Sequence, residues 1–271
     1  MRPSNYFETV PGIHIHYYDE GQGTPVIFVP GWTFSADVFE GQIEAFRDRY
    51  RIIAVDPRAH GRSTVTTLGV DHTTHAQDIA RLIGHLNLKD IILVGWSFGA
   101  YETWGVVREI GLDNIKGIFN IDMSPQAVST DETAWVEDKV QDICSTIRTI
   151  QTFAGFREVL ESYTREVMFQ REISDEEMDR IFDSARMPYH LACMEYALGV
   201  AGDYREEAKA ADRCPTCHTE MMVAEHWADA AVPYMQALCP DTELHVLGGH
   251  MAFWEYPDKF NAILDTFLSR C

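Results

Sequence analysis

Short apolar runs alternate with amphipathic segments over the first 125 residues. Runs of four to seven apolar residues bounded by turn residues are typical of strands buried on both faces of a parallel sheet. Segments with helical periodicity separate them. The strands predicted in this way occupy residues 13–18, 24–30, 51–56, 91–94 and 117–121. This alternation predicts an α/β fold, in which a mostly parallel sheet is covered by helices on both faces.

Two helices are expected between these strands. Residues 73–88 are predicted to form a helix, because their apolar residues recur at helical spacing and share one face: Ile79, Leu82, Ile83 and Leu86. Thr74 and Gln77 have the spacing of a capping box at its start. A second helix is expected from about Phe98.

From Gln126 to Asp212 the strand pattern stops and amphipathic helices are predicted. Ser174 and Glu177 form a capping box before one of them. Three apolar faces have helical spacing: Trp135, Val140, Ile143 and Ile147; Phe156, Val159, Leu160, Tyr163 and Val167; and Met178, Ile181, Phe182 and Ala185. Because such faces must be buried, we expect an all-helical cap over residues 126–212.

The alternation of strand and helix returns after residue 212. Strands are predicted at 216–224 and 243–247, a helix at 228–238, and a last helix from Pro257, which suits a first-turn position. The last segments therefore extend the sheet that the first ones begin. We predict one core, residues 1–125 and 213–271, with the cap inserted between its two parts.

The charge of the chain limits its partners. Asp and Glu outnumber Lys and Arg by 42 to 22, for a formal net charge of −20, and no Lys/Arg-rich run occurs. A surface of this sign repels nucleic acid and anionic lipid, so we expect neither as a partner. No apolar run has the ~20 residues of a membrane helix. The first ten residues lack the apolar core of a signal peptide, so a cytoplasmic location is expected.

The cysteines are scattered, except for one short motif. Cys214 to His218 reads C-x-x-C-H, which fits haem attachment, and its two thiols alone fit a redox pair. No second C-x-x-C completes a zinc site, and the apolar residues that follow predict a strand. We therefore interpret both thiols as core-facing, and we predict no cofactor and no metal.

The motif G-W-S-F-G, residues 95–99, lies where a predicted strand meets a predicted helix. Gly95 and Gly99 leave room for the strand and helix to approach closely, and Ser97 is exposed on the tight turn between them. The helix N-terminus directs its free N–H groups and its positive dipole end at the same point. This arrangement suits a serine nucleophile.

The nucleophile requires a base and an oxyanion hole. His250 follows two glycines between the last predicted strand and helix, whereas the rival His60 lies inside a turn motif and reads as structural. The backbone N–H of Phe98 would provide one oxyanion donor. Trp32, which follows Gly31 after the strand at 24–30, would provide the other.

With these motifs, the chain resembles the alpha/beta-hydrolase family over nearly its whole length. The matching pieces, in the family's order, are Pro30–Trp32, Asp56–Ser63, Gly95–Gly99 and Gly248–His250. Two positions depart from the family pattern, Pro30 where His is usual and Ala59 where Gly is usual. The resemblance implies the alpha/beta-hydrolase fold and a Ser-His-acid triad.

Three carboxylates compete for the acid position. The family's usual G-x-x-D after the penultimate strand is missing. Glu225 falls at that position by counting, and Asp229 fits the family's D-x-x-V-P pattern but reads better as a helix N-cap. Asp122 ends the strand after the nucleophile helix, where haloalkane dehalogenases and cofactor-free dioxygenases of the family carry their acid. We assign Asp122 and keep the other two as alternatives.

The resemblance implies a serine hydrolase of small carboxylic esters or related acyl compounds. The aromatic and Met-rich cap predicts an apolar or aromatic small-molecule substrate. Two alternatives remain open at this stage. One is a cofactor-free dioxygenase that cleaves a hydroxyquinolone-like ring, although Trp96 and Phe98 flank the serine where that family has histidines. The other is a hydrolase-fold receptor. The chain also resembles the non-haem haloperoxidase and perhydrolase branch.

Overall fold

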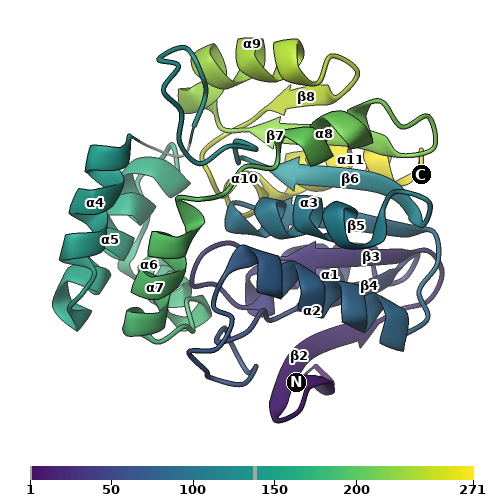
Figure 1. Ribbon diagram of the computed structural model, residues 1–271, viewed down its shortest axis with the longest axis horizontal. Helices are drawn as coiled ribbons and strands as arrows, with labels where there is room; N and C mark the ends of the chain where they lie inside the picture. The colour runs from purple at the N-terminus through teal and green to yellow at the C-terminus, as the bar shows by residue number, and fades with distance from the viewer. Residues whose placement is uncertain (1, 137–138) are drawn as a thin grey trace.

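A computed structural model describes residues 2–136 and 139–271 (Figure 1). Within them one eight-stranded sheet has the order β1-β2-β4-β3-β5-β6-β7-β8. β1 and β2 pair antiparallel, β2 also pairs antiparallel with β4, and the remaining pairs are parallel. The strands are β1 Asn5–Val10, β2 Ile13–Glu20, β3 Pro25–Val29, β4 Arg51–Val55, β5 Ile91–Trp96, β6 Ile115–Ile121, β7 His218–Val223 and β8 Glu243–Val246.

Helices cover both faces of the sheet, as the sequence predicts. Alternate residues of each strand face opposite sides. Val26 and Phe28 of β3 pack with α1 Glu40–Phe46 and α11 Pro257–Leu268, whereas Ile27 and Val29 pack with α2 His72–His85, α3 Phe98–Ile110 and α8 Arg205–Asp212. α9 Ala228–Leu238 packs with β7 through Met235 and Met221. The shorter helices of the core are η1 Ala36–Phe39, η3 Glu225–Trp227 and α10 Ala252–Glu255.

Between β6 and α8, the described residues form a group of helices that lies beyond the carboxyl ends of the parallel strands (Figure 1). These are α4 Val140–Thr149, α5 Phe153–Tyr163, the π-helix η2 Thr164–Met168, α6 Asp175–Ser184 and α7 Tyr189–Gly199. The capping box of Ser174 and Glu177 is confirmed. Residues 137–138 of the predicted cap lie outside the described residues.

Several local predictions were wrong. The N-cap of α2 is Asp71, whose carboxylate accepts both the Thr74 N–H and the Thr74 hydroxyl, so Thr74 lies in the first turn and is not the cap. Asp229 lies inside the first turn of α9 and is not its N-cap. Trp135 precedes α4 and is buried, whereas Val140 is exposed.

The predicted placement of the C-x-x-C-H segment agrees with the structure. Cys217 is buried directly before β7, and Cys214 is half-buried. Burial raises the pKa of the Cys217 thiol to about 12, so this thiol is protonated and unreactive at neutral pH. His218 is the first residue of β7 and bonds to Glu220.

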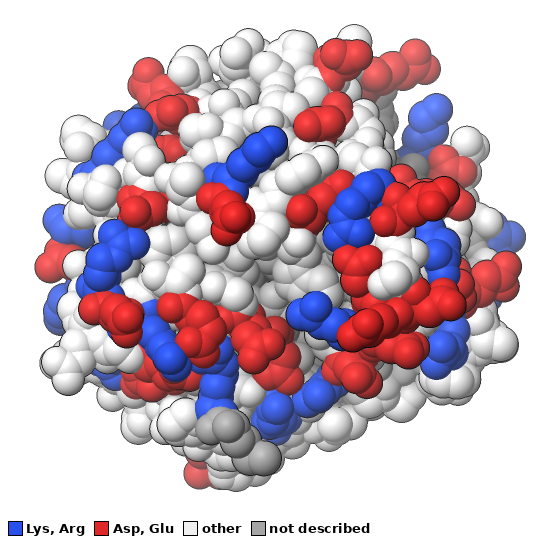
Figure 2. Space-filling model, turned by 180° about the vertical axis from the view of Figure 1, so that it is seen from behind, with Lys and Arg blue, Asp and Glu red and all other residues white. Residues whose placement is uncertain are grey.

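The acidic excess lies at the surface among basic side chains. On the face shown in Figure 2, Asp and Glu are interspersed with Lys and Arg. Within residues 2–136 and 139–271, no helix has the length and apolar character needed to cross a bilayer.

Glu220 on β7 gives the fold a pH-dependent contact. Its carboxylate is buried and lies 2.7 Å from His245 Nε2, 2.8 Å from His218 Nε2 and 2.9 Å from Arg270 Nη1. Burial alone would raise the pKa of Glu220, but the hydrogen bonds from His245 and His218 outweigh it and hold that pKa below its usual value. A depressed carboxyl pKa stabilises the fold above the unfolded pKa, and this stabilisation is lost as pH falls through the folded pKa.

We therefore expect Glu220→Gln to lower the melting temperature at pH 7. The difference from wild type should shrink as pH falls below the usual glutamate pKa. Thermal melts of both proteins from pH 7 down to pH 3 measure this. A difference that is constant over that range would contradict a contribution from the ionised carboxylate.

Candidate active site

The predicted nucleophile lies on a strained turn between β5 and α3. Ser97 has φ 54° and ψ −128°, a conformation that side-chain-bearing residues rarely adopt. A Cβ on Gly95 would lie 2.5 Å from Gly99 O, and a Cβ on Gly99 would lie 2.2 Å from Val29 O. Both glycines are therefore required by the close approach of α3 to the sheet, as the sequence motif predicts.

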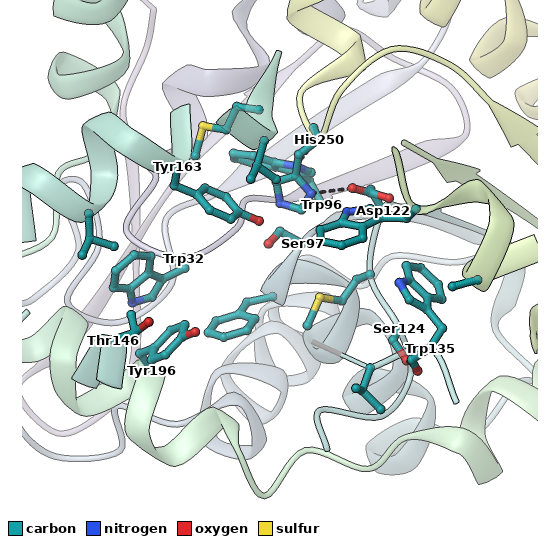
Figure 3. Close-up of a pocket in the computed structure, with 18 of the residues that line it drawn as sticks. Trp32, Trp96, Ser97, Asp122, Ser124, Trp135, Thr146, Tyr163, Tyr196 and His250 are labelled. Atoms are coloured by element: carbon teal, nitrogen blue, oxygen red, sulfur yellow. Dashed lines mark hydrogen bonds and ion pairs between the residues drawn. The ribbon is translucent and has the colours of Figure 1, made fainter. Parts of the chain in front are cut away.

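His250 and Asp122 form a buried pair. His250 Nδ1 lies 2.7 Å from Asp122 Oδ2, and both side chains are almost fully buried (Figure 3). An ionised carboxylate only accepts hydrogen bonds, so Nδ1 carries the proton and Nε2 keeps its lone pair. Asp122 Oδ1 accepts the Ala224 N–H at 2.8 Å, which fixes the second carboxylate oxygen.

Three contacts hold His250, two through its backbone and one through its ring. The Trp96 indole N–H donates to His250 O at 2.8 Å, and the His250 N–H donates to Val167 O at 3.0 Å. The Tyr163 ring meets the imidazole edge-on, with ring centroids 5.7 Å apart. Ser97 and His250 line the same cavity (Figure 3). The serine, the imidazole and the carboxylate are thus gathered at the carboxyl ends of β5, β8 and β6.

The two alternative acids lie elsewhere. Glu225 is exposed, and its carboxylate accepts the Gly248 N–H at 3.2 Å. Asp229 is exposed on α9. The rival histidine His60 is buried, with Nδ1 2.9 Å from Arg58 O and Nε2 3.4 Å from Glu195 Oε2. Of the three candidate acids Asp122, Glu225 and Asp229, Asp122 is the one whose carboxylate contacts His250.

The loop after β3 runs directly against the serine. A Cβ on Gly31 would lie 2.7 Å from Ser97 Cβ and 3.3 Å from Ser97 Oγ, so only glycine allows this approach. The Trp32 backbone N–H comes next in the chain, and the Phe98 N–H begins α3 directly after the serine. The Trp32 indole turns away and donates to Ala192 O on α7 at 2.8 Å.

A cavity of about 490 Å³ opens above the serine. Its walls are mainly apolar and aromatic, and both the sheet and helices α4, α5 and α7 contribute to them. Six residues that line the cavity were not predicted as site residues from the sequence: Ser124, Trp135, Thr146, Tyr163, Tyr196 and Trp227. Of these, Trp135 and Tyr163 appeared there only as members of apolar helical faces. Ser124 Oγ donates to Trp135 O and so fixes that segment at the cavity wall.

A sequence model described as the alpha/beta hydrolase family matches residues 26–263. The chain belongs to the alpha/beta hydrolase family. The match spans β4 to β8, nearly all of β3, the serine turn and the late histidine, whereas β1 and β2 precede it.

This hydrolase is similar in sequence to non-heme chloroperoxidase CPO-A1 of Kitasatospora aureofaciens, with 39% identity over 40% of each chain. It is 33% identical to a non-heme haloperoxidase of Rhodococcus erythropolis over 55% of this chain and 51% of that protein. These matches therefore span about half or less of either relative. An esterase structure from Exiguobacterium antarcticum has the same fold, with a TM-score of 0.87 at 21% identity over 98% of this chain and 100% of that one.

Proposed function

We propose that this hydrolase cleaves small carboxylic esters with a Ser97-His250-Asp122 triad. The contact of Asp122 Oδ2 with His250 Nδ1, 2.7 Å long and buried, carries the proposal. It leaves His250 Nε2 as a base in the cavity that also holds the Ser97 hydroxyl. A serine hydroxyl is a weak nucleophile unless such a base removes its proton.

In the first half-reaction Ser97 Oγ attacks the ester carbonyl carbon while His250 Nε2 takes the hydroxyl proton. The backbone N–H groups of Trp32 and Phe98 bind the oxyanion of the tetrahedral intermediate. The C–O bond to the alcohol then breaks, and His250 returns its proton to the leaving alkoxide. In the second half-reaction a water molecule attacks the acyl-enzyme by the same steps, and the acid and free Ser97 are released.

Helices α4, α5 and α7 act in this proposal as a cap over the serine, within residues 126–212. Thr146, Tyr163 and Tyr196 come from these helices and line the cavity (Figure 3). The aromatic walls favour an apolar or aromatic acyl or alcohol group, because the binding of such a group removes apolar surface from water. The same walls offer few polar partners to a charged group. The residues provide all groups that the reaction requires, so no cofactor enters the steps.

A panel of p-nitrophenyl esters tests this function. We expect kcat/KM to be higher for butyrate and benzoate than for a succinate monoester of similar size, because the free carboxylate would lose its hydration in the cavity. Initial rates at fixed pH and ionic strength measure this order. Comparable rates for the neutral and anionic acyl groups would contradict the apolar cavity as the substrate site.

A peroxide-dependent reaction is the second candidate, and the haloperoxidase relatives favour it. Hydrogen peroxide would replace water in the second half-reaction and leave with the acyl group as a peracid. The same triad and oxyanion donors suffice. Added peroxide should then yield peracid that oxidises halide, and this activity should disappear in Ser97→Ala together with the hydrolysis.

A further inference from the structure

A buried cluster of histidines and glutamates lies outside the proposed triad. His72 and His75 come from α2, Glu102 from α3 and Glu195 from α7, and all four are buried. One nitrogen or carboxylate oxygen from each lies within 4.8 Å of the others. The cluster therefore joins a helix of the proposed cap to two helices of the core.

The spacing of these atoms approximates that of a metal coordination shell. Glu102 Oε1 lies 2.8 Å from His75 Nδ1 and 3.5 Å from His72 Nδ1, and Glu195 Oε1 lies 3.5 Å from His75 Nδ1. In a tetrahedral zinc site with bonds of 2.0–2.1 Å, neighbouring ligand atoms are about 3.3 Å apart. Small shifts of these side chains would admit an ion between them.

Hydrogen bonding alone leaves this cluster incomplete. His72 is buried, yet neither of its ring nitrogens has a hydrogen-bond partner in the described part of the chain. Glu102 Oε2 also lacks one, and Glu195 Oε2 has only the 3.4 Å contact with His60 Nε2. Buried polar atoms are seldom left unpaired, because each costs the free energy of its lost hydration. In the tautomer with its proton on Nε2, His72 Nδ1 offers a lone pair to an ion beside Glu102 Oε1, which lies 3.5 Å away.

The charge of the cluster also suits a dication. Every ion pair that Glu102 and Glu195 make in the described part of the chain is with a histidine, and neither carboxylate meets a lysine or arginine. A divalent ion would neutralise the two buried carboxylates in place of the histidines that pair with them in this structure. Imidazole and carboxylate together are ligands for zinc and its first-row neighbours.

We propose that His72, His75, Glu102 and Glu195 bind a divalent first-row transition-metal ion, with zinc as the probe. The ion ties α7 to α2 and α3. α7 also carries Tyr196 of the cavity wall and Ala192, whose carbonyl accepts the Trp32 indole N–H. His72 packs against Phe98, with ring centroids 4.7 Å apart. The ion is thus a structural link behind the proposed oxyanion hole and takes no part in the chemistry.

His60 supports one ligand from outside. Its Nε2 lies 3.4 Å from Glu195 Oε2, the oxygen that does not face His75, and its Nδ1 lies 2.9 Å from Arg58 O. Such partners orient metal-binding carboxylates. His60 therefore has a positioning role for Glu195 in the proposed site.

Metal analysis of protein without an affinity tag tests the site. Wild type is unfolded in EDTA, refolded with zinc, cleared of loose metal and measured by inductively coupled plasma mass spectrometry, alongside His72→Phe and Glu102→Gln. The matched control is His218→Gln. It removes a histidine from the other His/Glu group, where Arg270 Nη1 already bonds to both Glu220 and Glu243. We expect about one zinc per chain in wild type and His218→Gln, and less than a tenth of that in the two cluster variants.

Two readouts on wild type keep the test valid if the variants misfold. Refolding with Co²⁺ should give the visible d–d bands of a tetrahedral site with nitrogen and oxygen ligands. Zinc at about 100 times its Kd should raise the melting temperature by about 5–10 °C over the EDTA-refolded protein. Wild type that takes up no zinc or cobalt would overturn the proposal, as would metal lost only in His218→Gln. Neither readout uses ester turnover, so they are independent of the proposed function.

Discussion

Replacing Ser97 by alanine should lower kcat for p-nitrophenyl butyrate by about 10⁶-fold. The variant keeps the cavity and the oxyanion donors but has no oxygen to form the acyl-enzyme. Alanine also tolerates φ 54° no worse than serine, so the fold should persist. Initial rates, with circular dichroism to verify folding, measure this.

The matched control is Ser162→Ala. Ser162 is exposed on α5 and bonds to Glu166, so its loss should leave kcat within twofold of wild type. Turnover by Ser97→Ala within tenfold of wild type would contradict a serine nucleophile. It would indicate that water is activated directly or that the activity comes from another protein.

Replacing Asp122 by asparagine should lower kcat by about 10⁴-fold. The asparagine can still accept the Ala224 N–H through its carbonyl, so its amide N–H₂ then faces His250 Nδ1. The imidazole must accept there, which moves its proton to Nε2. His250 can then no longer take the Ser97 proton, and nothing stabilises its cation.

Glu225→Gln and Asp229→Asn are the matched controls, because each makes the same chemical change at an acid that the sequence allowed. We expect both to retain kcat within threefold of wild type, since both side chains are exposed and the Glu225 carboxylate faces Gly248 N. A large loss in either one, with a small loss in Asp122→Asn, would move the acid to that residue.

The core elements and the serine turn were predictable because their signals are local. A buried strand, two glycines and a helix start occupy residues 91–104, and the strain at Ser97 follows from that geometry alone. The strand β1 was missed because Asn5–Val10 is an edge strand with polar and apolar residues and no continuous apolar run.

The acid was left open because its position depends on contacts that sequence spacing does not encode. Asp122 and His250 are 128 residues apart. Their meeting depends on the parallel pairing of β6 with β7, where the Asp122 N–H donates to Met222 O and the Asp122 carboxylate accepts from Ala224 N. Counting residues after the penultimate strand favoured Glu225, whose side chain turns toward Gly248 instead.

The His/Glu cluster escaped notice for a similar reason. His72 and His75 are three residues apart on one helix, which alone is a weak signal. Glu102 is internal to an apolar helix, and Glu195 reaches the site only because α7 packs against α2 and α3. The sequence provided no reason to expect a metal, and the metal content of the refolded protein tests that expectation.

The central claim is that Ser97 is an activated nucleophile, and labelling with a fluorophosphonate tests it most directly. Intact-mass spectrometry of wild type and Ser97→Ala, followed by peptide mapping, reads out the adduct. The proposed triad predicts a single adduct on wild type, located at Ser97, and none on the variant. Wild type that stays unlabelled would contradict the claim, and would favour the cofactor-free dioxygenase or the ligand receptor as the function of this fold.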